Sequence, residues 1–408
     1  LKSRGLGDVY KRQDLANKDG ADKAISNLAF VPAHYLKDFH PDYAEEADLQ
    51  AKVDESGFDT WVELFAVHAF PHVSGARPST AAWSPNGTST SDQVFTITRN
   101  PYYFAVDPEG NQLPYIDEVR FTFFADQETL NLGAVAGEID MQGRHIQMSS
   151  YPVLKENEEA GNYHVITWPT FGGSDAVVMF NQTWIANDPV MGALFQEKDF
   201  RVALSHAIDR NAIKESAFFG IGEARQPVPA PFHPYYPGDE YAFKYTEFDP
   251  DTANALLDGI GLTERDGDGM RLLPDGNPLD IELGVVPAFA NWPDITQLIV
   301  EDWAEVGIRS HVEIRERTPH FAMRPNNELM AEMWNDDTTG FPFSGQPKQD
   351  IRSDIALTFG PLYRVWYETN GAEGLEPPDE IKQLVEIIDE AKVSSPERQV
   401  ELAQELFK

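Results

Sequence analysis

The 408-residue sequence contains no cysteine at all. This absence excludes disulfide bonds, thiolate metal sites and cysteine nucleophiles within the chain. Long apolar runs are missing as well, since no stretch approaches about eighteen consecutive apolar residues, and the sequence therefore predicts no transmembrane helix.

Positive charge is scarce. The chain has 32 Lys and Arg residues against 67 Asp and Glu residues, which gives a formal net charge of −35. A surface of this sign repels nucleic acid phosphates and anionic lipid headgroups, so nucleic acid is excluded as a partner. Solubility in a salty or extracellular medium explains the acidic surface without a specific cationic partner.

Catalytic signatures are also missing. The sequence has no phosphate-binding loop, no GxSxG elbow and no HExxH motif. His68 and His72 are separated by Pro71, which prevents a shared helical face for metal ligands. His206 lies on a helix between two apolar turns and predicts packing, so we expect neither a metal nor a cofactor.

One acidic stretch resembles a calcium-binding loop. ERDGDGMRLLPDGNPL (264–279) places Asp266 and Asp268 at the right spacing, but it lacks the third acidic position and the closing Glu. The Gly, Pro and Asn residues predict the tip of a hairpin instead.

The pattern of apolar residues predicts an α/β protein. VRFTFF (119–124) alternates like a strand, a helix follows from Asp126 to about Gly137, and EIDM resumes an extended conformation. HVITWPTFGGSDAVVMFN (164–181) predicts two strands, and later segments predict further helices and a strand: 199–220, 250–261, 292–307 and 308–314. Strand, helix, strand units of this kind are typical of α/β lobes, and the length favours two or three of them.

MAEMWNDDTTGFPF (330–343) combines a pair of carboxylates, Asp336 and Asp337, with Trp334 and Asn335. Aromatic rings beside a half-buried carboxylate form a site for a cation or a polar chain. A capped turn with core aromatics explains the same residues equally well.

Several segments together resemble the extracytoplasmic solute-binding proteins of ABC importers, in the peptide-binding family 5. The resemblance rests on RNPYYFAVDPEGNQLPYIDEV (99–119), AVAGEIDMQ (134–142), FNQTW with DFRVALSHAIDRNAI, and MWNDD (333–337). The third stretch is the most specific, because it matches an Asn-containing strand followed by an Arg-x-Ala-Leu helix that ends in Ala-Ile-Asp-Arg.

The resemblance implies a two-lobed periplasmic-binding-protein-like fold of type II, with the chain crossing between lobes near residues 170–180. It implies a monomer that binds oligopeptides between its lobes and delivers them to an ABC permease in the membrane, without breaking a bond in the ligand. Relatives of this fold also bind oligosaccharides, so this alternative stays open. A carboxylate-based hydrolase is a weaker alternative, because no pair of carboxylates is singled out.

The resemblance also implies ligand-binding residues. In peptide binders the Asp of a Trp-x-x-Asp element holds the ligand's α-ammonium, and Trp334 and Asp337 fall at those positions. The expected ligand-binding residues are Asp337, Trp334, Asn335, Asn181, Phe180 and Trp184. Thr338 stands where the family often has an aromatic residue.

Residues 1–13 are basic, unlike the rest of the chain, and we expect them to be a non-native leader. Residues 14–172 are then expected to be the remainder of lobe one, and residues 173–408 lobe two without its C-terminal return segment. The expected location is periplasmic or extracytoplasmic, with a lipid anchor open for the full-length protein.

Overall fold

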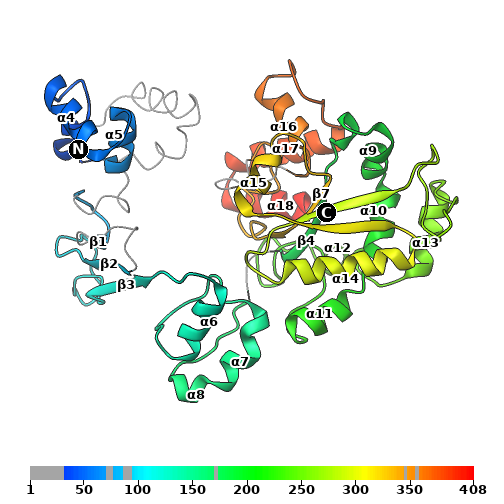
Figure 1. Ribbon diagram of the computed structural model, residues 1–408, viewed down its shortest axis with the longest axis horizontal. Coiled ribbons are helices and arrows are strands. Elements are labelled where there is room, and N and C mark those ends of the chain that lie inside the picture. The colour runs from blue at the N-terminus through cyan, green and yellow to red at the C-terminus, as the bar shows by residue number, and fades with distance from the viewer. Residues whose placement is uncertain (1–31, 70–76, 86–93, 170–172, 344–346, 354–357) are drawn as a thin grey trace. The chain divides into compact units, whose positions relative to one another are not determined.

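The computed structural model describes residues 32–69, 77–85, 94–169, 173–343, 347–353 and 358–408 (Figure 1). The chain divides into two compact units, unit 1 (Leu1–Asp126) and unit 2 (Gln127–Lys408). The expected leader and residues 170–172, beside the expected lobe boundary, lie outside the described residues. In the part of the chain that is described, no helix has the length and hydropathy needed to cross a membrane.

Unit 1 contains a small helical cluster and a three-stranded sheet. Its elements are α3 (Ala33–Leu36), the 3-10 helix η2 (Lys37–Phe39), α4 (Glu46–Ser56), α5 (Trp61–Ala69), β1 (Trp83–Pro85), β2 (Val94–Arg99) and β3 (Glu118–Thr122). The strands pair antiparallel in the order β1-β2-β3. Between β2 and β3, Asp107 accepts hydrogen bonds from the backbone N and the Nδ2 of Asn111, which closes a turn.

Unit 2 contains most of the helices. They are α6 (Gln127–Val135), η3 (Met148–Ser150), α7 (Tyr151–Glu156), α8 (Glu158–Gly161), η4 (Trp184–Ala186), α9 (Pro189–Gln196), α10 (Lys198–His206), α11 (Arg210–Phe218), α12 (Asp239–Ala242), α13 (Pro250–Gly259), α14 (Trp292–Glu305), α15 (Arg317–Met323), α16 (Pro361–Glu368), α17 (Asp379–Lys392) and α18 (Pro396–Leu406). Several begin as the sequence predicts; Asp249, for example, caps α13 by accepting from Thr252 N.

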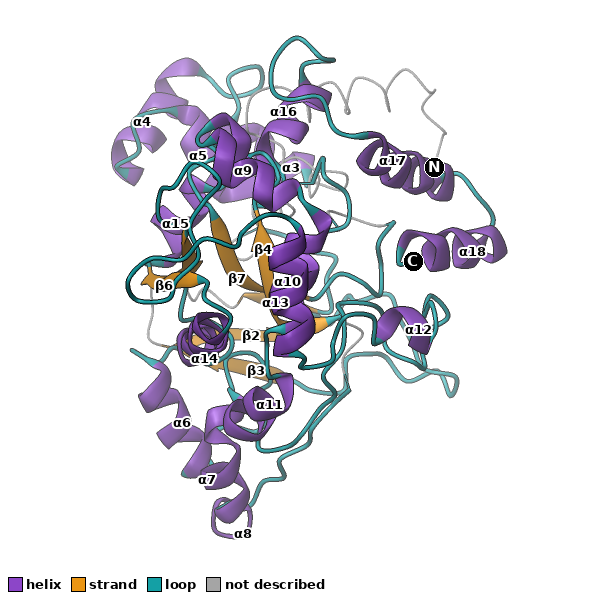
Figure 2. Ribbon diagram, turned by 90° about the vertical axis from the view of Figure 1, so that its right-hand side faces the viewer, coloured by secondary structure: helices purple, strands orange, loops and turns teal. Residues whose placement is uncertain are grey.

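A mixed four-stranded sheet organises unit 2. It consists of β4 (Ser174–Phe180), β5 (Asp280–Val285), β6 (Arg309–Ile314) and β7 (Ala331–Asp336) in the order β4-β7-β5-β6. β4 pairs antiparallel with β7, whereas β5 pairs parallel with both β6 and β7. Helix α14 packs along β5 and β6, and α10 lies beside α13 (Figures 1 and 2).

The main core lies between this sheet and its helices. Phe200, Leu204 and Ala207 of the predicted 199–220 helical pair are fully buried in it. Trp303 of α14 is fully buried too and donates from Nε1 to the carbonyl oxygen of Leu204. The apolar periodicity therefore predicts the correct buried face of these helices.

Two predicted strands are wrong. Residues 138–141 and 164–168 have no strand structure, so the predicted strand, helix, strand unit has its first strand in β3 and no second one. Both segments are short and have no pairing partner among the described residues, and a strand needs a neighbour to satisfy its backbone. The predicted hairpin tip at 264–279 is confirmed by bridges between Arg265 and Arg271 and between Leu272 and Pro278.

Candidate functional site

The end of β7 brings together three of the six expected ligand-binding residues: Trp334, Asn335 and Asp337. Ala331 and Met333 anchor the strand in the core, and Trp334 and Asn335 follow before it ends at Asp336. Asp337, the next residue, is exposed. The strand thus holds one side chain in the core and presents another to solvent within four residues.

Trp334 packs inside the protein. It is 6% exposed, and its ring centre lies 4.7 Å from that of Trp292 and 5.1 Å from that of Phe321. The guanidinium carbon of Arg324 lies 5.0 Å from the ring centre, within the range of a cation–π contact. The structure therefore gives Trp334 a role in fixing the end of β7, and direct contact with a ligand stays a prediction.

Three oxygens at the end of β7 surround a primary ammonium group, that of Lys348. The Lys348 Nζ donates to the backbone O of Asn335 at 2.6 Å, to Asn335 Oδ1 at 2.8 Å and to Asp337 Oδ1 at 2.7 Å. The lysine side chain is 7% exposed, whereas that of Asp337 is 63% exposed. We call Asn335 O, Asn335 Oδ1 and Asp337 Oδ1 the ammonium cradle, because together they satisfy the three donors of an ammonium.

Two further carboxylates lie near the cradle. Burial raises the pKa of the Asp336 carboxyl, which accepts hydrogen bonds from Gln349 Nε2 at 3.1 Å, although Lys348 opposes this shift. Asp336 is thus half-buried. The Asp175 side chain is exposed but lies in the concave wall of a cavity, where protein atoms replace much of the surrounding water. This loss of hydration raises the pKa of Asp175, and the negative charge of Asp337 raises it further.

A buried ionic network holds the start of β7. Glu332 is 1% exposed, and its Oε2 lies 2.8 Å from His320 Nε2 and 2.9 Å from Arg324 Nη2. Thr358 donates a hydrogen bond to the other carboxylate oxygen. Burial by itself would raise the pKa of Glu332, but Arg324 and these hydrogen bonds outweigh it and lower the pKa. The network ties α15 to the strand that carries the cradle.

Asn181, another predicted ligand residue, lies in a buried amide network. It is 1% exposed; its Nδ2 donates to Asn327 Oδ1 at 2.8 Å and to Leu329 O at 2.9 Å, and its Oδ1 accepts from Thr183. All polar atoms of the side chain are therefore satisfied within the protein. This is a structural arrangement, and ligand contact by Asn181 stays a prediction.

Phe180 is the last residue of β4, and Trp184 follows it in η4. Phe180 stacks at 5.9 Å on Trp303 and also lines the cavity described below, whereas Trp184 packs against the core. The register pairs Phe180 with Ala331 and Ser174 with Asp336, so Phe180 and Asp337 are at opposite ends of the strand pair. Six residues along a strand correspond to about 20 Å, so only an extended ligand could contact both groups.

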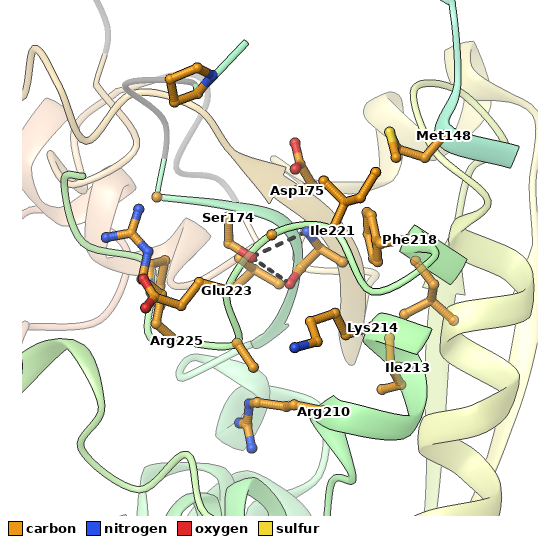
Figure 3. A pocket seen from close by; sticks show the side chains of 18 of the residues that line it. Met148, Ser174, Asp175, Arg210, Ile213, Lys214, Phe218, Ile221, Glu223 and Arg225 are labelled. Atoms are coloured by element: carbon orange, nitrogen blue, oxygen red, sulfur yellow. Dashed lines mark hydrogen bonds between the residues drawn. The ribbon is translucent and has the colours of Figure 1, made fainter. Parts of the chain in front are cut away.

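Unit 2 contains a large cavity of about 1730 Å³. Its walls include α10, α11, the 221–232 loop, the start of β4 and residues 134–168. The last segment is held in place by Gln147, whose Nε2 donates to Ala288 O at 3.2 Å, and by His145, which stacks on Phe289. Figure 3 shows that the side chains of Ser174, Arg210, Lys214 and Phe218 meet around this space.

Sequence reasoning missed Lys348 and the cavity cations Arg210 and Lys214. The spacing of four residues in RNAIK, on a helix with Ile213 buried, could have shown that the two cations share a face. No local signal could have found Lys348, which lies eleven residues after Asp337 in the sequence. His206 takes the packing role that the sequence predicts, with Nδ1 at 3.0 Å from the Glu247 carbonyl oxygen.

Residues 81–346 match the profile of the bacterial extracellular solute-binding proteins, family 5, middle region. The chain belongs to this family. A family 5 solute-binding protein has the two-lobed, mixed α/β fold of type II periplasmic binding proteins, and solved structures similar to this chain share it.

Curated relatives of this family 5 protein differ in what their names say they bind. The chain is 27% identical over 300 residues to the periplasmic alpha-galactoside-binding protein of Rhizobium meliloti, covering 68% of this chain and 39% of the relative. It is 26% identical over 287 residues to the oligopeptide-binding protein AppA of Bacillus subtilis, covering 69% of this chain and 47% of the relative. The chain thus spans less than half the length of these relatives.

The solved structures similar to this chain also include both a peptide-binding and a sugar-binding protein. An oligopeptide-binding protein OppA is 33% identical, with a TM-score of 0.63 over 92% of this chain and 62% of that chain. The periplasmic binding protein MelB of Agrobacterium fabrum, solved with stachyose, is 21% identical, with a TM-score of 0.66 over 95% of this chain and 56% of that chain. These neighbours are binding proteins, and at this identity MelB supports the fold alone.

Proposed function

We propose that this protein is the substrate-binding component of an ABC importer and captures oligopeptides between its two lobes for delivery to a membrane permease. Family membership supports the coarse part of this proposal. The ammonium cradle at the end of β7 supports the peptide as ligand, and it is the observation that carries the proposal.

The cradle is chemically matched to the N-terminus of a peptide. An α-ammonium has three N–H donors, as the Lys348 ammonium does, and one acceptor in the cradle is a carboxylate. Charge-assisted hydrogen bonds of this kind are about twice as strong as neutral ones. Lys348 therefore marks a position at which a ligand ammonium would make the same contacts.

A ligand ammonium can occupy the cradle only if the Lys348 ammonium moves out of it, and this exchange is feasible. Asp337 is 63% exposed, so an incoming ammonium can approach the carboxylate from solvent. The exchange replaces one ammonium by another, and the loss of the Lys348 contacts is offset by identical contacts to the ligand. Affinity must then come from the rest of the peptide, in particular from side chains and backbone in the 1730 Å³ cavity.

An oligosaccharide is the second candidate ligand, and a specific observation favours it. Trp168 lines the cavity with 69% of its surface exposed, and sugar rings stack on such aromatic faces. The 27% identical relative named as an alpha-galactoside-binding protein supports the same alternative. If Lys348 never leaves Asp337, a ligand without an ammonium group would be preferred.

A thermal-shift panel of tri- to pentapeptides and galacto-oligosaccharides tests the proposal. A ligand that binds the folded protein only adds RT ln(1 + [L]/Kd), about 2.7 kcal/mol at a hundredfold excess over Kd. We expect stabilisation by peptides and recovery of the peptide intact after incubation. Stabilisation by galacto-oligosaccharides alone would select the second candidate, and cleavage of the ligand would contradict the binding function.

A further inference from the structure

The lining of the cavity in unit 2 reverses the charge balance of the protein. Whereas the chain has 67 acidic and 32 basic residues, its cavity presents more cations than acids. The cationic side chains are Lys198, Arg201, Arg210, Lys214 and Arg225, and the acidic ones are Asp140, Asp175 and Glu223. Concave, low-dielectric walls of one sign concentrate ligands of the opposite sign.

The cavity arginines are satisfied by neutral acceptors. Arg210 donates to the backbone O and to Oγ of Ser205, both at 2.7 Å, and burial lowers its pKa to about 10. Arg201 donates to the Phe195 carbonyl oxygen at 2.5 Å, and Arg225 donates to a backbone carbonyl as well. These hydrogen bonds fix the guanidinium groups, and within the described parts of the chain no carboxylate forms an ion pair with them.

These contacts leave two lysines of the cavity lining, Lys198 and Lys214; Lys198 is exposed, whereas Lys214 is half-buried. Lys214 lies on α11, four residues after Arg210 and next to the buried Ile213. Figure 3 shows its side chain pointing into the cavity, below Ser174 and beside the loop that carries Glu223 and Arg225. Among the described residues, its Nζ has no hydrogen bond and no ion pair, and Glu223 is not paired with it.

Two cations four residues apart on one helix face repel each other by a few tenths of a kcal/mol, unless an anion lies between or beside them. A half-buried ammonium also loses hydration that only a ligand or water can replace. An acid-rich chain has many ways to place a carboxylate beside Lys214, yet the described cavity wall does not.

We propose that Lys214, supported by the positive charge of Arg210, binds a carboxylate group of the ligand. This inference rests on the proposed function and narrows its ligand to one with a free carboxylate. A peptide provides such a group at its C-terminus or on an acidic side chain, and an acidic oligosaccharide provides it on a uronate. The ammonium cradle lies near the Ser174 end of β4, and Ser174 also lines the cavity that contains Lys214. A zwitterionic ligand such as a peptide therefore fits both the cradle and Lys214.

Calorimetry with matched ligand pairs tests this assignment. One pair is a tetrapeptide with a free or an amidated C-terminus, and the other is a trigalacturonate and the neutral galactotriose. We expect the wild-type protein to bind the carboxylate member of one pair at least about 10-fold more tightly, with a preference that shrinks as salt rises. The pair that shows the preference identifies the source of the carboxylate.

Three variants assign the effect to Lys214. Lys214→Gln should remove most of the preference, while Lys214→Arg should keep it, because both cations bind a carboxylate. Lys155→Gln removes the same charge from α7, outside the cavity, and should leave the preference unchanged. Melting temperatures of the variants show whether each is folded.

The outcomes separate the inference from the proposed function. Equal affinity for charged and neutral members, or a preference that survives in Lys214→Gln, overturns the inference and leaves the binding function standing. Failure of every peptide and oligosaccharide to bind the folded wild-type protein overturns the proposed function, and the inference with it.

Discussion

Lys348 Nζ lies 2.7 Å from Asp337 Oδ1, so the exposed carboxylate at the end of β7 is paired with an ammonium from its own chain. This pair links the family resemblance to a chemical property of the site. The oxygens that hold Lys348 are the ones that a peptide N-terminus would need, and a tethered group competes with a ligand at an effective concentration on the order of millimolar.

Removing the tethered competitor should strengthen peptide binding. We expect Lys348→Gln to raise the affinity for a free-amino tetrapeptide by about 10-fold, because glutamine lacks the charge that pairs with Asp337. The affinity for galacto-oligosaccharides should not change. Isothermal calorimetry on the wild type and the variant measures both, and weaker peptide binding in Lys348→Gln would show that the lysine supports the site rather than competing for it.

The stability of the protein should depend on pH through Asp336. Burial raises the pKa of this carboxyl above its ordinary 3.8 in the folded state, so the folded protein keeps the proton to higher pH than the unfolded chain does. The contribution of Asp336 is therefore most favourable below the unfolded pKa, and it is lost as pH rises through the folded pKa.

Asp336→Asn should remove this contribution while keeping a hydrogen-bonding partner for Gln349. As pH rises from 3 to 7, the free energy of unfolding of the variant, measured by urea denaturation, should fall less or rise more than that of the wild type. Parallel curves for the two proteins would contradict the raised pKa.

Asn181→Ala should destabilise the protein without abolishing ligand recognition at Asp337. The substitution removes the buried hydrogen bonds that Asn181 makes with Thr183 and with Asn327, at a cost of about 1–3 kcal/mol, although Thr183 and Asn327 still bond each other. Asn326→Ala is the control, since this exposed side chain bonds only the Ala322 carbonyl oxygen among the described residues. Urea denaturation measures the difference, and equal stability of the two variants would argue against the network.

Glu332→Ala should be more damaging, because it leaves Arg324 and His320 buried without a carboxylate. Breaking such a pair costs about 3–5 kcal/mol. Since Arg324 also packs on Trp334, the variant should alter the fluorescence of that tryptophan. Glu328→Ala, three residues before β7 and exposed, is the matched control.

The sequence predicts the helices and their buried faces well because local signals determine them. Asp249 and Gly261 bound α13, and Phe200 and Leu204 recur at helical spacing on α10. Strands at 138–141 and 164–168 were predicted wrongly because a strand depends on a pairing partner elsewhere in the chain, which no local pattern specifies.

The candidate site was predictable only in part, because it too depends on residues from distant parts of the chain. The Trp-x-x-Asp pattern points to Trp334 and Asp337, and the structure places both at the end of β7. Whether a ring at that position faces a ligand or the core depends on Trp292 and Phe321, which come from distant segments. The pairing of Asp337 with Lys348 depends equally on tertiary structure.

The most direct test of the central claim compares the binding of one tetrapeptide with a free or an acetylated N-terminus to the wild-type protein and to Asp337→Ala. Truncating one partner of a charge-assisted pair costs on the order of 2–5 kcal/mol, so the variant should bind the free-amino peptide about 30-fold to several thousandfold more weakly. The acetylated peptide, already weak, should bind both proteins alike. Equal binding of the free and acetylated peptides to the wild type would contradict the account.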